Sequence, residues 1–307
     1  MNGHHRIRNA VLTGMAAVLL AVCLYLGMRI VSLEKELQMQ QADMERIGNE
    51  VGVYLDEKTV TVSWSGKVWC SYGDSITQEA SWQDYITDYF GFSKHYNRGI
   101  GSSAFVKTEQ IWYANPDGSY NSRYGVETFE APEGTTVHEG YLCSWDRITT
   151  QIPKDVDLVI VNGGTNDSGV WVNAPIGDLS YPFDETTFMG AVASTVVKIQ
   201  EHVPNAVIVL MSPLSGRGPE DEAEMYKNQT KPFVNDIGLT VQDYAEAMEE
   251  VAEYLSIPFI DLFGTTGINE FNRTQYIRDI CHPNAEGGKA IARVIIGRLR
   301  ELEPIVE

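Results

Sequence analysis

Two short apolar runs constrain the fold of this chain more than any other feature of its sequence. Residues 155–162 (DVDLVIVN) and 206–212 (AVIVLMS) are almost continuously apolar. A strand with one face in water alternates apolar and polar residues, whereas a strand covered by helices on both faces of its sheet is apolar throughout. The two runs therefore predict central strands of a parallel sheet.

Helical patterns alternate with such runs from residue 51 onward. Further strands are expected at residues 67–72, 94–97 and 257–262. Helices are expected at residues 79–90, 187–202, 237–255 and 285–302. The apolar face of the first of these helices would carry Trp82, Tyr85, Ile86 and Tyr89. Strands that alternate with helices imply a parallel sheet covered on both sides, so the sequence predicts an α/β fold.

Two segments interrupt this alternation. Residues 106–136 are rich in Gly, Asn, Pro and aromatic residues, and residues 216–230 contain the acidic run PEDEAE. Long irregular insertions in a compact domain are usually functional loops or disordered segments. We expect the first insertion to shape the substrate side of an active site, and the acidic run to be a solvated surface.

The net charge of −19 narrows the classes of partner. Residues 1–51 contain five Lys and Arg and five Asp and Glu, so the excess acidity lies in residues 52–307. A body this acidic argues against nucleic acid or anionic lipid as its partner. The four Cys residues have no CxxC spacing, which predicts neither a disulfide framework nor a zinc site.

The N-terminus has the pattern of a membrane anchor. Residues 10–28 are uncharged and, as a helix, long enough to cross about 30 Å of hydrocarbon. Arg6 and Arg8 precede this run, so the positive-inside rule places the N-terminus in the cytoplasm and the body outside. A cleaved signal peptide is the alternative, but the run is long for a signal core and no small-x-small cleavage site follows it. We expect residues 1–29 to be a cytoplasmic tip and a retained transmembrane anchor.

A heptad pattern follows the apolar run. Its core positions alternate spacings of three and four residues: Ile30, Leu33, Leu37, Gln40, Met44, Ile47 and Val51. Three heptads are the lower limit for a coiled coil. Residues 30–51 are therefore either a stalk that forms dimers or trimers or a single amphipathic helix. Residues 52–307 would then form the α/β domain.

Polar residues gather where the predicted strands end or the helices begin, which is where parallel α/β sheets place their functional groups. Four segments have this position: residues 73–75 (GDS), 97–102 (NRGIGS), 163–167 (GGTND) and 279–284 (DICHPN). Taken alone, Ser75 is typical of a helix N-cap and Asn166 of a turn. Together, the four segments supply each part of a serine-hydrolase site.

Ester hydrolysis by a serine needs these residue types. A serine hydroxyl is a poor nucleophile until a base takes its proton, and His is the side chain whose titration range suits that role. The base in turn needs an acceptor that fixes its tautomer. Of the His residues beyond the N-terminal run, only His282 has a carboxylate three residues upstream, Asp279, on a turn that leads into a helix.

The oxyanion that forms during the attack needs N–H donors that are already in place. Asn166 can supply a side-chain N–H and Ser75 a backbone N–H. The glycine-rich segment at residues 97–102 can supply a third donor, because glycine lets the backbone approach a ligand closely. That donor is the amide of either Gly101 or Ser102.

The chain resembles the SGNH hydrolases, also called GDSL-type esterases and lipases. GDS at residues 73–75, GTND at 164–167 and DxxH at 279–282 match three of the family's four blocks, in order and on the expected elements. The resemblance covers roughly residues 67–302. In the family's second block a glycine usually lies five residues after its Asn, where this chain has Ser102, whereas Gly101 comes one residue early.

The resemblance implies a flavodoxin-like α/β/α sandwich and ester hydrolysis with neither a metal ion nor a cofactor. It implies Ser75 as the nucleophile, His282 as the base and Asp279 as the residue that orients His282. It also implies an oxyanion hole made of the Ser75 N–H, a backbone N–H of the second block, and Asn166.

Residues 99–104 (GIGSSA) also fit the dinucleotide fingerprint G-x-G-x-x-A. That fingerprint should open a helix, with an acidic residue about 20 residues further on at the end of the next strand. An irregular loop follows instead, so no dinucleotide cofactor is expected. No G-x-S-x-G motif occurs in the chain, which disfavours the common α/β-hydrolase fold.

The expected function is removal of short acyl groups, acetyl above all, from a carbohydrate outside the cytoplasm. Aromatic residues that could stack on sugars cluster in sequence around the site-forming loops: Trp82, Trp112, Tyr113, Tyr120, Tyr124, Trp145 and Trp171. Trp112 and Asp74 are the residues expected to contact substrate. The alternatives are a lipid or long-chain esterase, an acyltransferase with the same site, and a catalytically silent, membrane-anchored binding protein.

Overall fold

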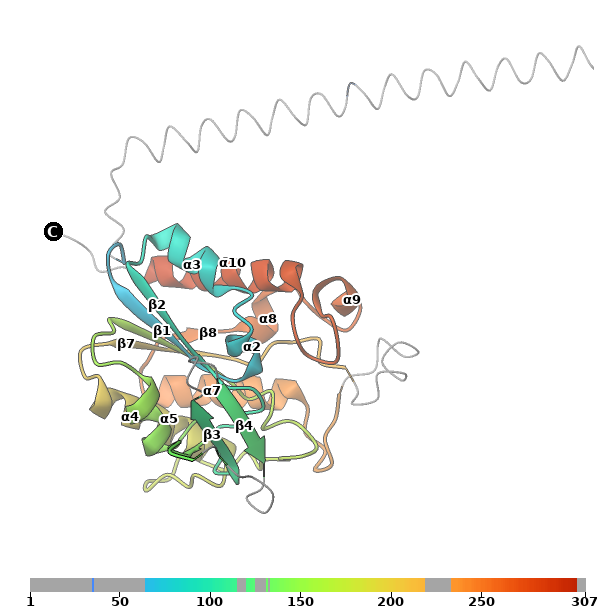
Figure 1. The fold of residues 1–307 in the computed structure, drawn as a ribbon. Helices are drawn as coiled ribbons and strands as arrows, with labels where there is room; N and C mark the ends of the chain where they lie inside the picture. Colours follow the sequence, from blue (N-terminus) through green and yellow to red (C-terminus); the bar gives the residue numbers. More distant parts are fainter. Residues whose placement is uncertain are drawn as a thin grey trace, which may run out of the picture. The chain divides into compact units, whose positions relative to one another are not determined.

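The computed structural model describes residues 64–114, 120–124, 131, 133–218 and 233–302, together with Lys35. The chain divides into two units, Met1–Thr61 and Val62–Glu307, and every helix and strand named below belongs to the second unit (Figure 1). The predicted anchor (residues 10–28) and stalk (residues 30–51) lie outside the described residues, apart from Lys35. Among the described residues, no helix combines the length and the apolar character needed to span a membrane.

A five-stranded parallel sheet forms the centre of the second unit. In spatial order its strands are β2 (Lys94–Gly99), β1 (Val68–Gly73), β6 (Leu158–Asn162), β7 (Val207–Met211) and β8 (Phe259–Ile260). Each neighbouring pair runs parallel. Counted along the chain, this order is 2-1-3-4-5, which is the flavodoxin-like order, and the predicted parallel α/β fold is confirmed.

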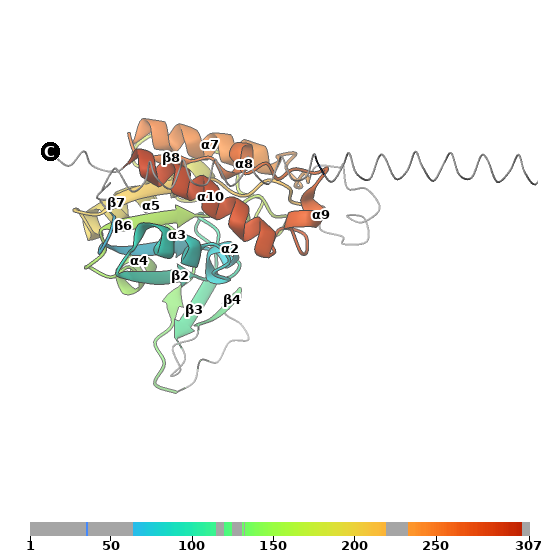
Figure 2. The same ribbon diagram turned by 90° about the horizontal axis from the view of Figure 1, so that it is seen from above.

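Helices cover both faces of this sheet, as Figures 1 and 2 show. One face is covered by α3 (Gln83–Phe90) and α10 (Ala285–Glu301). The other is covered by α4 (Trp145–Gln151), α5 (Phe188–His202) and α7 (Val241–Tyr254). The one-turn helices α2 (Ser75–Gln78), α8 (Leu262–Thr265) and α9 (Arg273–Tyr276) lie in the connections.

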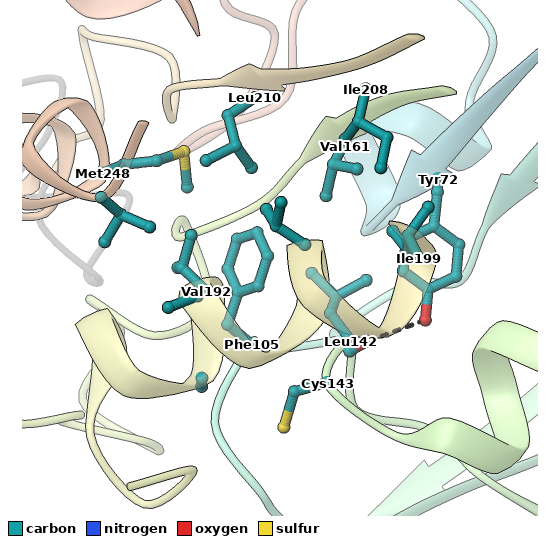
Figure 3. Close-up of a cluster of buried hydrophobic side chains, with 14 of the residues drawn as sticks. Tyr72, Phe105, Leu142, Cys143, Val161, Val192, Ile199, Ile208, Leu210 and Met248 are labelled. Atoms are coloured by element: carbon teal, nitrogen blue, oxygen red, sulfur yellow. Dashed lines mark hydrogen bonds between the residues drawn. The ribbon is translucent and has the colours of Figure 1, made fainter. Parts of the chain in front are cut away.

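Alternate side chains of the strands fill the two layers of the core. Tyr72 and Val161 point to the face that packs against Ile199 of α5 (Figure 3). Ile160 points to the opposite face, which packs against Ile291 of α10. Because each side chain of a central strand meets a helix on one face or the other, the strand is apolar at every position, as its sequence predicts.

The helix predicted at residues 79–90 begins four residues later, at Gln83, and a separate one-turn helix, α2, precedes the predicted range. Ala80 adopts a left-handed backbone conformation (φ 55°), which a right-handed helix cannot contain, so α2 and α3 are separate helices. Ile86 of α3 is buried, but Tyr85 and Tyr89 are exposed. The prediction that Tyr85 and Tyr89 belong to the buried apolar face of this helix is therefore wrong.

The insertion at residues 106–136 contributes to a second, antiparallel sheet that the sequence did not predict. In spatial order its strands are β4 (Tyr120–Tyr124), β3 (Gln110–Ala114) and β5 (His138–Glu139). β3 and β4 stand outside the main sheet in both views (Figures 1 and 2). The Gln110 side chain donates a hydrogen bond to the carbonyl of Gly101 (2.8 Å) and so ties the small sheet to the glycine-rich segment.

Candidate active site

The candidate site lies at the carboxyl ends of β1, β2 and β6, where the strand order reverses. Ligands of open α/β sheets bind at such switch points. β1 ends at Gly73 and leads into α2, whose N-cap is Asp74 and whose first residue is Ser75. β2 leads into the glycine-rich segment, and β6 leads into residues 163–167. Three of the four predicted segments therefore meet at one edge of the sheet.

The fourth segment brings a His–Asp pair to Ser75. His282 Nε2 lies 2.8 Å from Ser75 Oγ, and His282 Nδ1 lies 2.9 Å from Asp279 Oδ2. All three side chains are partly exposed to solvent. The structure thus brings together the three residues expected to carry the reaction, although Ser75 and His282 are 207 residues apart in the chain.

The turn between α9 and α10 holds Asp279 in place. Its Oδ1 accepts the N–H groups of Cys281 (2.9 Å) and His282 (2.8 Å). Partial burial alone would raise the pKa of this carboxyl group, but the two amides and the His282 side chain together lower the pKa below its usual value. A carboxylate can only accept hydrogen bonds, so Nδ1 of His282 carries the shared proton and Nε2 is left to accept the Ser75 hydroxyl.

The same turn also groups three residue types that bind metal ions. Cys281 Sγ lies 3.7 Å from His282 Nδ1. The ligand atoms of Asp279, Cys281 and His282 all lie within 4.8 Å of one another.

The glycine-rich segment packs against the end of α2. Asn97 Nδ2 donates to the carbonyl of Thr77 (2.9 Å), and Asn97 Oδ1 accepts the N–H of Gly99 (2.9 Å). A Cβ atom at Gly99 would lie 2.1 Å from the backbone nitrogen of Gln78, so this approach requires glycine. The N–H of Gly101 donates to Gln78 Oε1 at 2.7 Å. The Gly101 N–H therefore already donates a hydrogen bond to a side-chain carbonyl oxygen.

Gly101 and Ser102, the two candidate oxyanion donors, differ in their surroundings. A Cβ atom built on Gly101 would lie 3.9 Å from the Cβ atom of Ser75, so Gly101 is beside the expected nucleophile. Ser102 adopts a left-handed conformation (φ 64°), which favours glycine. The left-handed backbone that usually needs a glycine is therefore at Ser102, whereas the glycine of this chain is one position earlier, at Gly101.

Asn166, expected to donate to the oxyanion, is 6% exposed. Its Nδ2 donates to the carbonyl of Ser103 (2.9 Å) and lies 3.4 Å from Asp74 Oδ2. The longer contact is the weaker of the two. A negatively charged oxygen bound next to Ser75 would compete with Asp74 for that N–H.

Two buried carboxyl groups lie beneath the site. Asp74, which was expected to contact substrate, is instead fully buried, and it accepts the N–H of Ile76 as the N-cap of α2. Asp167 is also fully buried and accepts the N–H groups of Phe105 (2.9 Å) and Val106 (3.1 Å). Burial raises the pKa of Asp74 to about 6 and the pKa of Asp167 to about 7. Asp74 therefore holds the backbone around Ser75, and its side chain does not face a substrate.

Trp112 is also placed differently from the expectation. It is 4% exposed, and its ring stacks on that of His138 with the ring centroids 4.7 Å apart. Trp82 is fully buried. Neither indole presents a face to a substrate, because their apolar surfaces are covered by protein.

Two of the tryptophans expected to stack on sugars are exposed, and one of these lies close to the site. Trp145 on α4 is 44% exposed, and Trp171, in the loop after β6, is 49% exposed. The guanidinium of Arg217 lies 5.3 Å from the centroid of the Trp171 ring and donates to the carbonyl of Thr165. Trp171 is therefore held beside the segment that carries Asn166.

Arg147 on α4 supports the site, although the sequence analysis did not single it out. Its guanidinium donates to the carbonyls of Gly73 (2.7 Å) and Gly140 and to Ser103 Oγ (2.7 Å), and it lies over the ring of Tyr72. These contacts join the end of β1 to the segment after β2. A single basic residue in a helix is usually on the surface, so nothing in the sequence marks Arg147 as buried.

Comparisons with known proteins agree with this geometry. The family model described as GDSL-like Lipase/Acylhydrolase family matches residues 71–290. Among curated proteins, the GDSL esterase/lipase CPRD49 of Arabidopsis thaliana is 28% identical over 158 residues, which are 49% of this chain and 59% of that protein. The chain thus spans about three fifths of the length of this curated relative.

Solved structures share the fold. A protein from Lactobacillus plantarum has a TM-score of 0.56 and 22% identity, with 77% of this chain and 98% of that chain covered. A possible lipase from Chitinophaga pinensis has a TM-score of 0.50 and 17% identity, with the same coverage of both chains.

Proposed function

Because the chain belongs to the GDSL-like lipase/acylhydrolase family, a family of carboxylic ester hydrolases, we propose that it cleaves esters with Ser75 as its nucleophile. His282 is the general base, and Asp279 orients it. One observation carries this proposal: the continuous hydrogen-bonded row from Ser75 Oγ through the His282 ring to Asp279. A nucleophile in contact with a base, and a base oriented by an acid, are the parts of a serine-hydrolase triad.

The reaction follows from this row in two steps. Nε2 of His282 takes the proton of Ser75 while Oγ attacks the ester carbonyl, and the imidazolium then protonates the leaving alcohol. The carboxylate of Asp279, 2.9 Å away, stabilises that imidazolium. In the second step Nε2 takes a proton from water while the water oxygen attacks the acyl carbonyl, and the imidazolium returns that proton to Ser75 Oγ as the carboxylic acid leaves.

The oxyanion hole is formed by the N–H of Ser75, the N–H of Gly101 and Nδ2 of Asn166. Gly101 is chosen over Ser102 because it lies beside Ser75 and its N–H already donates to a carbonyl oxygen, that of Gln78. Oε1 of Gln78 stands in for the oxygen of the substrate. When the oxyanion forms, it replaces Oε1 at Gly101 and Asp74 at Asn166.

Substitution of the nucleophile tests the proposal. Ser75→Ala should lower kcat/KM for a chromogenic acetate ester by about 10⁴-fold or more, because no other hydroxyl contacts His282 Nε2 in the described structure. Ser93→Ala, which changes an exposed serine far from this row in sequence, is the matched control and should keep full activity. A Ser75→Ala variant with a normal melting curve and most of its activity would show that another residue is the nucleophile.

The substrate in this proposal is a carbohydrate that carries short acyl groups. The supporting observation is Trp171, whose half-exposed indole lies beside the segment of Asn166 and is held by Arg217. A flat, exposed aromatic face can pack on a sugar ring. The insertion at residues 106–136 has few aliphatic side chains and so offers little surface for a long acyl chain.

The two exposed tryptophans make a matched pair for a test of the substrate. Trp171→Ala should lower kcat/KM for an acetylated glycan by about tenfold and leave a small chromogenic acetate almost unaffected, since remote contacts serve only the larger substrate. Trp145→Ala, with the same loss of exposed indole elsewhere, should affect neither substrate. Faster hydrolysis of octanoyl than of acetyl esters would instead identify a lipid esterase.

The site of action in this proposal is outside the cytoplasm, on a membrane anchor at residues 10–28. Its support is the uncharged run behind Arg6 and Arg8. Protease added to intact cells should remove the α/β domain and leave a short fragment in the membrane. Recovery of a free protein that begins after Met28 would show that the run is a cleaved signal.

A further inference from the structure

The Asp279–His282 turn presents a thiol on the side of the imidazole that faces away from Ser75. Cys281 Sγ lies 3.7 Å from His282 Nδ1, and Asp279 Oδ2 lies 2.9 Å from the same nitrogen. Nε2, on the other side of the ring, is the atom that contacts Ser75. A carboxylate oxygen, a thiol sulfur and an imidazole nitrogen therefore lie within 4.8 Å of one another at this turn.

The distances from His282 Nδ1 to Cys281 Sγ and to Asp279 Oδ2 are close to the ligand–ligand distances of a tetrahedral zinc site. With Zn–N of about 2.0 Å and Zn–S of about 2.3 Å, the nitrogen and sulfur ligands of such a site lie about 3.5 Å apart. The Sγ–Nδ1 distance of 3.7 Å is already close to that value. The Nδ1–Oδ2 distance of 2.9 Å would open to about 3.4 Å as the ion replaces the shared proton.

We propose that Asp279, Cys281 and His282 Nδ1 bind a thiophilic divalent cation of the zinc type, and that this ion switches the esterase off. The proposal rests on the function assigned above to His282. Three protein ligands leave a fourth position for water, and carboxylate, thiolate and imidazole are all ligands that zinc accepts. This set of ligands has no CxxC spacing, because it contains a single cysteine.

Inhibition follows from the tautomer of the histidine. For catalysis Nδ1 carries a proton and Nε2 carries the lone pair that accepts the Ser75 proton. A cation at Nδ1 needs the lone pair of that nitrogen, so the ring proton must move to Nε2. The thiol of Cys281 loses its proton to solvent as the metal–sulfur bond forms. The ring then has no lone pair facing Ser75, and the base is lost.

The surroundings permit a cation to enter and leave. The Asp279 and His282 side chains are 29% and 23% exposed, so a cation reaches the turn from the side of these two residues. Arg278 is the cationic group that opposes binding, with its Nε 3.6 Å from Asp279 Oδ2. The guanidinium of Arg278 also pairs with Glu79, which partly neutralises it.

The test compares the full-length protein with its Cys281→Ser variant, which removes the sulfur but none of the groups that act on the ester. Both should hydrolyse a chromogenic acetate at similar rates in chelator. Zinc at about ten times its dissociation constant should lower the activity of the wild type about tenfold, and chelator should restore it. Loss of an outer-shell partner alone weakens metal sites by about 10–100-fold, so loss of the thiolate should weaken binding by at least about 100-fold. Equal inhibition of the two proteins would overturn the proposal.

A second readout does not depend on activity. Cobalt added to the Ser75→Ala variant should give the absorption of a thiolate–cobalt bond, and this band should vanish in Ser75→Ala/Cys281→Ser. Cys70 and Cys143 are buried, and Cys23 is common to both variants, so the difference reports Cys281. No band would overturn the metal site even if the enzyme is an esterase. A band in Ser75→Ala together with a wild type that hydrolyses no ester would instead overturn the proposed function and keep the site.

Discussion

Gln78 is the residue whose position was least expected. Its side-chain carbonyl accepts the N–H of Gly101 at 2.7 Å, although we propose that this amide stabilises an oxyanion beside Ser75. The Gln78 side chain is exposed, so an incoming ester can displace it into water. Its neutral amide is then a weak competitor for the donor, because an oxyanion accepts a charge-assisted hydrogen bond and a neutral carbonyl does not.

A change of charge at Gln78 tests this role. Gln78→Glu should lower kcat/KM for a small acetate ester by about 10–100-fold, because a carboxylate would bind the Gly101 N–H strongly and repel the oxyanion; loss of one oxyanion donor costs about 10²–10³-fold. Gln78→Met, of similar shape but without the acceptor, is the control and should be at least as active as the wild type. Equal activity of the Glu variant and the wild type would assign the donor to Ser102 instead.

At this scale the sequence predicts residue types better than their surroundings. Ser75, His282 and Asp279 could be selected because their chemistry is rare and their spacing specific. Asp74 and Trp112 were expected on the substrate side, yet burial is set by the whole fold, and the same residue types occur in caps and cores. Gln78 carries no signal in the sequence, since glutamine on a helix is usually only a surface residue.

Among the elements, α4 has the largest unpredicted effect on the site. It lies outside the strands and helices expected from the sequence, and it carries Arg147 into contact with the end of β1 and the segment after β2. A guanidinium carries five N–H donors spread over a rigid planar fork, so it can reach more separated acceptors than the compact ammonium of lysine. Arg147 thus joins the end of β1, just before Ser75, to the segment that carries Gly101 and Ser103.

Arg147→Lys should therefore disturb both stability and catalysis. Lysine keeps the charge but cannot reach all of the acceptors, and each buried group left unpaired costs about 1–3 kcal/mol. We expect the free energy of unfolding to fall by about 2–4 kcal/mol and kcat to fall by about tenfold, with KM for a small ester little changed. Arg300→Lys, on the exposed side of α10, should change neither quantity. A fully active and stable Arg147→Lys variant would show that Arg147 is not needed to hold the end of β1 against the segment after β2.

The small antiparallel sheet could not be predicted from the sequence. Residues 155–162 indicate a buried strand by their composition alone, whereas β3 (QIWYA) and β4 (YNSRY) contain no long apolar run. Their pairing depends on residues that meet only after folding, such as Ile111 opposite Arg123. The parallel sheet could therefore be predicted from the sequence, and the antiparallel one could not.

For the whole α/β domain, buried carboxyl groups link stability to pH. The pKa of Asp167 is about 7 in the folded protein and about 3.8 as a free side chain. Between these values the folded state binds more protons than the unfolded state, so this group stabilises the fold at low pH and the contribution is lost as pH rises toward 7 and beyond. His95 acts in the opposite direction, because burial lowers its pKa to about 4 and favours the neutral form.

Asp167→Asn isolates the first effect. The asparagine oxygen can still accept the N–H groups of Phe105 and Val106, both of which reach Oδ1, but it has no proton to lose. The stability of the wild type relative to this variant should fall by more than about 1 kcal/mol between about pH 5 and about pH 8, as measured by urea unfolding. His95 cancels in this comparison. A difference that stays constant across the range would show that Asp167 remains charged throughout.

The hydrogen bond between Ser75 and His282 also bears on the point in synthesis at which the chain can become active. Synthesis delivers β1 and Ser75 early, while His282, the proposed base, follows 207 residues later. Chains fold from the N-terminal side as they are made, so until residue 282 is added the growing polypeptide would hold the proposed nucleophile without the group that activates it. Under this proposal hydrolytic activity begins only when the turn before α10 docks onto a finished sheet, and a copy that ends before residue 282 should hydrolyse no ester.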